Sequence, residues 1–80
     1  MLEPFRRTYG GKRHLSIRRR LLVDEPFCRE CRKEGRLTHA TVRDHVQPLS
    51  QGGADTYENS QPLCKRHHDS KTAHERMARQ

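Results

Sequence analysis

The chain of 80 residues carries 17 Lys and Arg against 10 Asp and Glu, a formal net charge of +7, and 30% of it is hydrophobic. This length forms one small domain and excludes an enzyme whose site lies between the layers of a large fold, and no apolar run approaches the ~20 residues that cross a membrane. Leu, Ile, Val and Phe total 13 of the 80 residues, so we expect either a disordered basic peptide or a domain held together by something other than apolar burial.

Residues 1–12 are predicted to form a flexible basic arm, because Pro4 and the pair Gly10-Gly11 disfavour regular structure. Residues 1–20 carry seven basic side chains and one acidic side chain, a net +6 (7 − 1), and the remaining residues carry ten and nine, a net +1 (10 − 9). Such an arm suits nucleic acid, because it displaces counterions from the phosphates. The alternative is a solvated arm that only aids solubility, whereas a membrane surface is disfavoured because the arm has no clean amphipathic stripe.

Residues 13–80 are predicted to form a single domain that begins with a helix over residues 13–23. The apolar side chains of this helical segment do not share one face. The helix is expected to end at Asp24-Glu25-Pro26, because a proline disfavours helical conformation in the residue that precedes it.

Two short strands and a second helix are predicted for the rest of the domain. Residues 38–46 are rich in β-branched side chains, which favours a strand that ends before Pro48. Residues 51–55 are expected to form a loop, because their two glycines tolerate positive φ. Residues 61–64 are predicted to form the second strand, and residues 65–80, with good helix formers and no Gly or Pro, a C-terminal helix.

The three cysteines predict a metal site rather than disulfides. Their odd number does not suit a disulfide framework, and the start of the chain lacks the apolar region of a secretory signal peptide, so we expect a reducing cytoplasm. Cys28 and Cys31 form a C-x-x-C pair, and Cys64 and His67 form a C-x-x-H pair. Two such pairs predict a tetrahedral structural zinc site, although a C-x-x-C pair alone is also typical of redox proteins.

The histidine that completes the zinc site is one of two neighbours. The C-x-x-H spacing favours His67 for zinc and leaves His68 free for another role, since successive helical residues point about 100° apart. An exchange of these two roles is the alternative. The other candidates, His14, His39 and His74, are expected to be solvated, with His39 a weak alternative zinc ligand.

A second set of polar residues comprises Asp44 and His45 at the end of the predicted strand, Asn59 after the loop and His68 on the helix. Each has an ordinary structural explanation when taken alone, such as an ion pair, a turn cap or a solvated side chain. In their joint order and spacing, however, these residues resemble the HNH endonuclease family, the ββα-metal nucleases.

The resemblance covers roughly residues 20–75 and runs through CREC (28–31), DHVQPL (44–49), GGAD (52–55), NSQPLC (59–64) and HDSKT (68–72). It implies a small α+β domain with the ββα-metal (HNH) fold, held together by a structural zinc and preceded by a basic arm and a helix. One departure is that His67 stands where the commonest family pattern has a cysteine. Imidazole binds zinc well, so the ligand set is still complete.

Hydrolysis of a phosphodiester needs an activated water, a cation on the phosphate and stabilisation of the leaving 3′ oxygen. We expect His45 to be the general base, because imidazole titrates near neutral pH. Asp44 offers a hard oxygen ligand for a divalent cation such as Mg²⁺ or Mn²⁺, and His68 is the expected second ligand. Asn59 is expected to hold the loop and to orient His45. The resemblance implies the same four roles.

The sequence therefore predicts a metal-dependent endonuclease that nicks DNA or cuts both strands. Expected phosphate contacts are Arg18, Arg19, Arg20, Lys65 and Lys71, although ordinary exposed charge explains each of them equally well. The alternatives are a zinc-bound nucleic-acid-binding module without catalysis and a structural zinc domain that binds protein. Any protein partner of the chain is expected to belong to a phage packaging or restriction complex.

Overall fold

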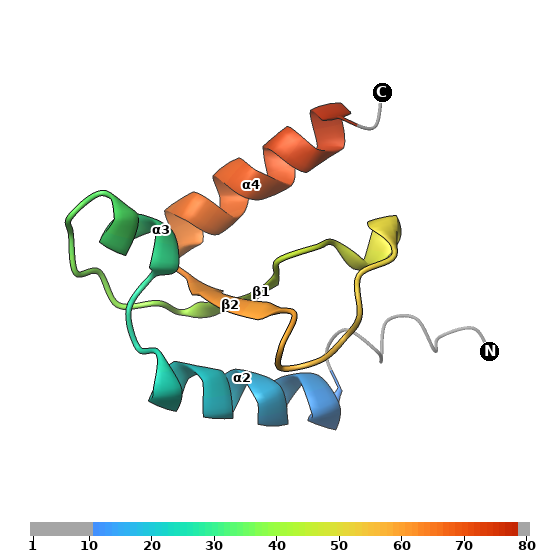
Figure 1. Cartoon of the computed structure of the whole chain (residues 1–80), viewed down its shortest axis with the longest axis horizontal. Coiled ribbons are helices and arrows are strands. Elements are labelled where there is room, and N and C mark those ends of the chain that lie inside the picture. Colours follow the sequence, from blue (N-terminus) through green and yellow to red (C-terminus); the bar gives the residue numbers. More distant parts are fainter. Residues whose placement is uncertain (1–10, 79–80) are drawn as a thin grey trace.

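The computed structural model describes residues 11–78 of the chain. In chain order it contains helices α2 (Lys12–Asp24) and α3 (Arg29–Lys33), strand β1 (Val42–His45), the 3-10 helix η1 (Leu49–Gln51), strand β2 (Ser60–Leu63) and helix α4 (Lys65–Ala78). Helix α2 lies along one side of the two-stranded sheet, and α4 rises from the other side (Figure 1). The predicted small α+β domain is confirmed, and no helix among the described residues is long and apolar enough to span a membrane.

Helix α2 is one residue longer at each end than predicted, so Lys12 of the predicted arm begins the helix, and residues 1–10 lie outside the described residues. Polar contacts hold α2 against the sheet. Arg18 Nη2 donates to the backbone oxygen of Thr41 at 3.0 Å, and His14 Nδ1 lies 3.1 Å from a guanidinium nitrogen of Arg43. The prediction that His14 is solvated is therefore wrong, because the helix turns its ring toward a buried arginine.

The predicted strand over residues 38–46 is divided into two parts that have different partners. Residues 38–40 run antiparallel to residues 26–28, with hydrogen bonds from the Cys28 backbone N–H to the oxygen of Thr38 at 2.7 Å and from Ala40 N–H to the oxygen of Pro26 at 2.8 Å. His39 is exposed, as predicted, and its ring packs against Phe27 with centroids 5.1 Å apart; it is not part of the cluster formed by the three cysteines and His67. The strand propensity of residues 38–46 does not reveal this change of partner, because both parts of the segment have an extended backbone.

Strand β1 pairs antiparallel with β2, and the register joins Val42 to Leu63 and His45 to Ser60. Because side chains alternate across a strand, Arg43 and His45 share one face of β1 while Asp44 lies on the other. The contacts follow this alternation, since Arg43 contacts α2 and Asp44 contacts α4. Strand β1 therefore divides its polar side chains between two sides of the domain.

The hydrophobic core is very small. Among the described residues, the buried large aliphatic side chains are Leu21 and Leu63, and the other buried apolar side chains are those of Pro62 and the three cysteines. Leu63 forms one buried cluster with these cysteines. The cysteines therefore lie at the centre of the fold.

The Leu63→Ala substitution is expected to lower the free energy of unfolding by about 2–5 kcal/mol, because it opens a cavity in the buried cluster that contains the cysteines. The matched control is Leu37→Ala, whose side chain is 72% exposed and whose effect is expected to stay within about 0.5 kcal/mol. Chemical denaturation followed by circular dichroism measures both changes. Equal effects of the two substitutions would contradict this account of the core.

Candidate functional site

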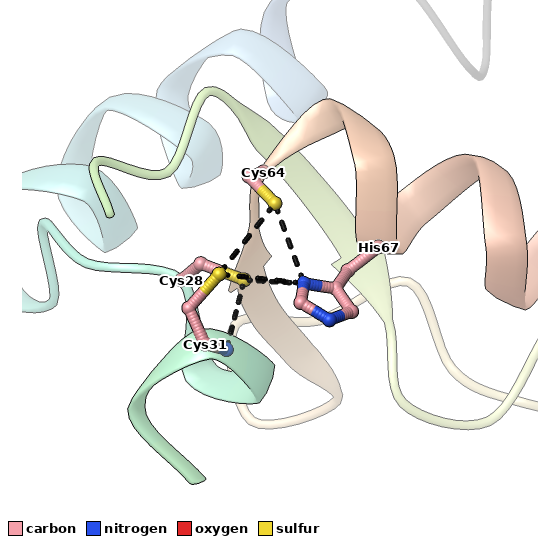
Figure 2. Close-up of side chains that lie close together, drawn as sticks. All are labelled: Cys28, Cys31, Cys64 and His67. Carbon is pink, nitrogen blue, oxygen red and sulfur yellow. Dashed lines mark hydrogen bonds between the residues drawn. The ribbon is translucent and has the colours of Figure 1, made fainter. Parts of the chain in front are cut away.

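Two segments far apart in the sequence bring three sulfur atoms and one ring nitrogen together (Figure 2). Cys28 caps α3, Cys31 lies within it, Cys64 directly precedes α4, and His67 lies in the first turn of α4. The Nδ1 atom of His67 is 3.4–3.5 Å from the three sulfur atoms, and the four ligand atoms all lie within 4.8 Å of one another. The ligand atoms of a tetrahedral zinc lie about 3.5–3.8 Å apart, so this donor set fits zinc in both chemistry and spacing.

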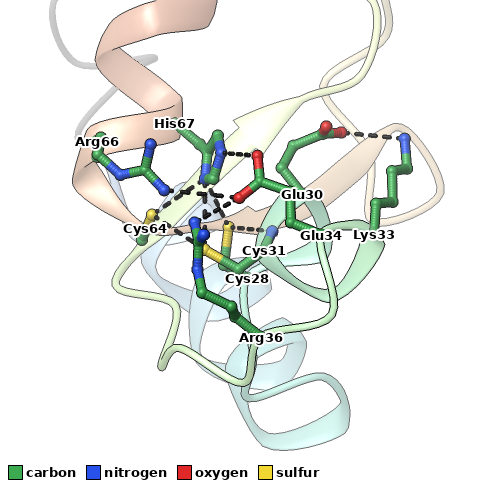
Figure 3. A network of polar contacts seen from close by, with 9 residues as sticks. All are labelled: Cys28, Glu30, Cys31, Lys33, Glu34, Arg36, Cys64, Arg66 and His67. Atoms are coloured by element: carbon green, nitrogen blue, oxygen red, sulfur yellow. Dashed lines mark hydrogen bonds and ion pairs between the residues drawn. The ribbon is translucent and has the colours of Figure 1, made fainter.

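The ring of His67 is fixed from its other side by Glu34. Its Nε2 atom lies 3.1 Å from Oε2 of Glu34, whose other carboxylate oxygen, Oε1, pairs with Arg36 and lies 3.7 Å from Arg66 (Figure 3). The hydrogen bond with His67, together with the nearby guanidinium groups, keeps the pKa of the Glu34 carboxyl below its ordinary value. An ionised carboxylate accepts the proton of Nε2, which leaves the lone pair of Nδ1 directed at the sulfur atoms.

The local environment also favours the thiolate form of Cys31. A hydrogen bond with Thr38 outweighs the effect of burial and lowers the pKa of the Cys31 thiol to about 6. A thiolate, rather than a thiol, is the form that binds metal. The three cysteines form no disulfide with one another, so all three sulfur atoms are available as ligands.

Asp44, His45 and His68 line a separate pocket of about 150 Å³ between the end of β1, η1 and α4. One oxygen of Asp44 accepts a hydrogen bond from Gln61 at 3.0 Å and lies 3.2 Å from Lys71 Nζ. The other oxygen lies 3.8 Å from His68 Nε2. Two ligands of one small divalent cation are at most about 4.2 Å apart when each is ~2.1 Å from it. The spacing of Asp44 and His68 therefore fits a shared cation.

The His45 side chain is nearly buried and contacts the loop between the two strands. Its Nε2 atom lies 3.0 Å from Oδ1 of Asp55, and the same oxygen lies 2.9 Å from the guanidinium group of Arg43. Burial raises the pKa of the Asp55 carboxyl, but the hydrogen bonds with His45 and Arg43 lower it by more, so it stays below its ordinary value. The sequence reasoning missed this contact between Asp55 and His45, although Asp55 ends the GGAD segment.

Asn59 holds the two ends of this loop together. Its side chain accepts a hydrogen bond from Gln47 N–H at 3.0 Å and donates to the backbone oxygens of Gln47 and Ala54 at 3.0 and 2.8 Å. Gly53 makes the closure possible, because a Cβ at this position would lie 1.9 Å from the Gln47 oxygen. In the described part of the chain the side-chain hydrogen bond to the His45 ring comes from Asp55, whereas the side-chain hydrogen bonds of Asn59 go to the loop backbone.

Four of the five residues expected to contact phosphate have partners within the protein. Arg18 contacts the sheet, Arg20 lies 4.0 Å from the centre of the Tyr57 ring, and Lys65 pairs with Asp69 at 2.6 Å. Lys71 lies beside Asp44, pairs with Glu75 and donates to the backbone oxygen of His45 at 3.0 Å. Arg19 is exposed on the outer side of α2. Lys71 therefore belongs to the pocket, whereas Arg19 belongs to the outer surface.

Comparison with known proteins identifies the family. The family profile described as HNH endonuclease matches residues 28–74. The crystal structure of the HNH endonuclease of the deep-sea thermophilic bacteriophage GVE2 with manganese ion is 30% identical to the chain, with a TM-score of 0.79 over 91% of this chain and 83% of that one. No curated protein sequence gives a significant match. A family match over more than half of the chain, together with the shared fold, shows that the chain belongs to the HNH endonuclease family.

Proposed function

We propose that the chain is a DNA endonuclease that hydrolyses phosphodiester bonds with the help of one divalent cation. The observation that carries this proposal is the convergence of Asp44, His45 and His68 on one pocket at the end of β1. Membership of the HNH endonuclease family supports nuclease activity. The manganese ion in the phage HNH endonuclease supports a divalent cation as cofactor, and Mg²⁺ satisfies the same kind of ligands.

The residues of the pocket have two tasks, which are proton transfer and cation binding. His45 is the general base that takes a proton from the attacking water, and Asp44 and His68 hold the cation. When bound, a divalent cation polarises a phosphoryl oxygen and stabilises the charge on the leaving oxygen. Lys71 and Gln61 occupy one oxygen of Asp44 and leave its other oxygen for the cation.

We further propose that Cys28, Cys31, Cys64 and His67 hold one structural zinc. Four protein ligands fill a tetrahedral site and leave no position for substrate, which separates this centre from the catalytic pocket. Zinc at such a site contributes folding free energy on the order of 10 kcal/mol in small domains. The small number of buried aliphatic side chains in the described region supports this dependence on metal.

We propose that the basic outer surface of α2 contacts the DNA backbone. Lys12, Arg13 and Arg19 are exposed on this helix, and their charges suit phosphates. The predicted contact between Lys65 and a phosphate has less structural support, because the ammonium group of Lys65 already pairs with Asp69. The cytoplasmic location and a protein partner in a phage packaging or restriction complex remain predictions.

The catalytic role of His45 is tested by plasmid cleavage with Mg²⁺ or Mn²⁺. The zinc-loaded wild type is expected to cleave DNA, and His45→Ala is expected to cleave about 10²–10⁴ times more slowly, because a general base contributes this much. His74→Ala, which removes an exposed histidine of α4, is the matched control and should keep the wild-type rate. A wild type that binds DNA and never cuts it with any divalent cation would instead support a non-catalytic binding module.

The two neighbouring histidines are predicted to separate metal content from activity. His67→Ala is expected to release zinc and to lose helical structure, because it removes one of four ligands, whereas His68→Ala keeps one zinc per chain and loses cleavage. Elemental analysis and circular dichroism measure the first property, and plasmid cleavage measures the second. Loss of zinc from His68→Ala, with zinc retained by His67→Ala, would show that the two histidines have exchanged roles.

A further inference from the structure

One carboxylate oxygen joins the proposed general base to a buried arginine. Oδ1 of Asp55 lies 3.0 Å from His45 Nε2 and 2.9 Å from Arg43 Nη2. Arg43 and His45 are two residues apart on β1 and therefore share one face of the strand, so a single side chain from the loop reaches both of them. The roles assigned above to Asp44, His68 and Asn59 do not account for this contact.

Arg43 fixes the position of Asp55 because the Arg43 side chain is itself held in place by burial and by several polar contacts. Its side chain has no exposed surface. It donates to Ser60 Oγ at 2.8 Å and to the Thr56 backbone oxygen at 3.3 Å, and it lies 3.1 Å from His14 Nδ1. A buried guanidinium group is costly without a charged partner, and Asp55 is the carboxylate that faces it. Asp55 is thus held both in place and in its ionised form.

An ionised carboxylate only accepts hydrogen bonds, so the nitrogen of His45 that faces Asp55 must carry a proton. In the neutral ring the other nitrogen, Nδ1, then has the free lone pair. We propose that Asp55, held by Arg43, is a positioning residue that fixes the tautomer and orientation of His45 so that Nδ1 takes the proton of the attacking water. This inference rests on the proposed function, in which His45 is the general base.

The test compares Asp55→Asn with Glu58→Gln in the zinc-loaded protein. Asp55→Asn keeps the size of the side chain and an oxygen acceptor for Arg43, but it replaces a charge-assisted hydrogen bond with a weaker neutral one. Glu58 is exposed in the same loop, so Glu58→Gln removes an equal charge without altering the contact. Two properties are measured: the steady-state rate of plasmid cleavage, and the proton position on the His45 ring by ¹⁵N NMR without the divalent cation.

The wild type is expected to carry the proton of neutral His45 on Nε2. In Asp55→Asn we expect a mixture of the two tautomers and a kcat lower by about 10- to 100-fold, because a misaligned base loses reaction geometry, with KM for DNA within about 2-fold. Glu58→Gln should match the wild type in both measurements.

Two results would overturn the role of Asp55: a proton on Nδ1 in the wild type, or an unchanged tautomer and kcat in Asp55→Asn. The first result is obtained on the unmutated protein, so it decides the question even if Asp55→Asn folds poorly. The NMR measurement requires no cleavage. Absence of cleavage by the wild type with every divalent cation would therefore overturn the proposed function separately from the tautomer assignment.

Discussion

The convergence of three sulfur atoms and one imidazole nitrogen determines the arrangement of the domain. These atoms come from two segments more than 30 residues apart, and the contacts between them fix the start of α4 against α3. His68 follows His67 directly, and successive helical residues point about 100° apart. Once His67 Nδ1 faces the sulfur atoms, His68 is turned toward Asp44, at 3.8 Å. The cluster that holds the fold together thus also positions one wall of the pocket.

Strand β1 supplies the second constraint, because its alternation sends neighbouring residues to opposite sides. Asp44 contacts groups on α4 and β2, whereas His45 contacts the loop that Asn59 closes. Both side chains nevertheless line the pocket at the end of the strand, so this pocket receives an imidazole and a carboxylate from different directions. A short strand is therefore sufficient to form a pocket in a chain of 80 residues. A chain of this length is too short for a pocket between two large layers.

The local parts of this arrangement could be predicted from the sequence, and the parts that depend on tertiary pairing could not. The C-x-x-C and C-x-x-H spacings indicate the sulfur cluster because a tight turn fixes both ligands of a pair, and the start of α4 follows from its helix formers. The division of residues 38–46 depends on a change of partner strand. The contact between Asp55 and His45 depends on how the loop folds back, and no periodic pattern records that path.

The polar composition of the chain has a direct consequence for how its site tolerates change. Five polar or charged side chains are buried, namely Arg43, Asp44, His45, Ser60 and Gln61, and no buried side-chain nitrogen or oxygen in the described region lacks a hydrogen-bond partner. In such a network the removal of one partner leaves another buried and unsatisfied, which costs about 1–3 kcal/mol for a neutral group and more for a charged one. Substitutions at Asp55 or Arg43 therefore affect both the stability of the domain and the position of the His45 ring, and only conservative exchanges separate the two effects.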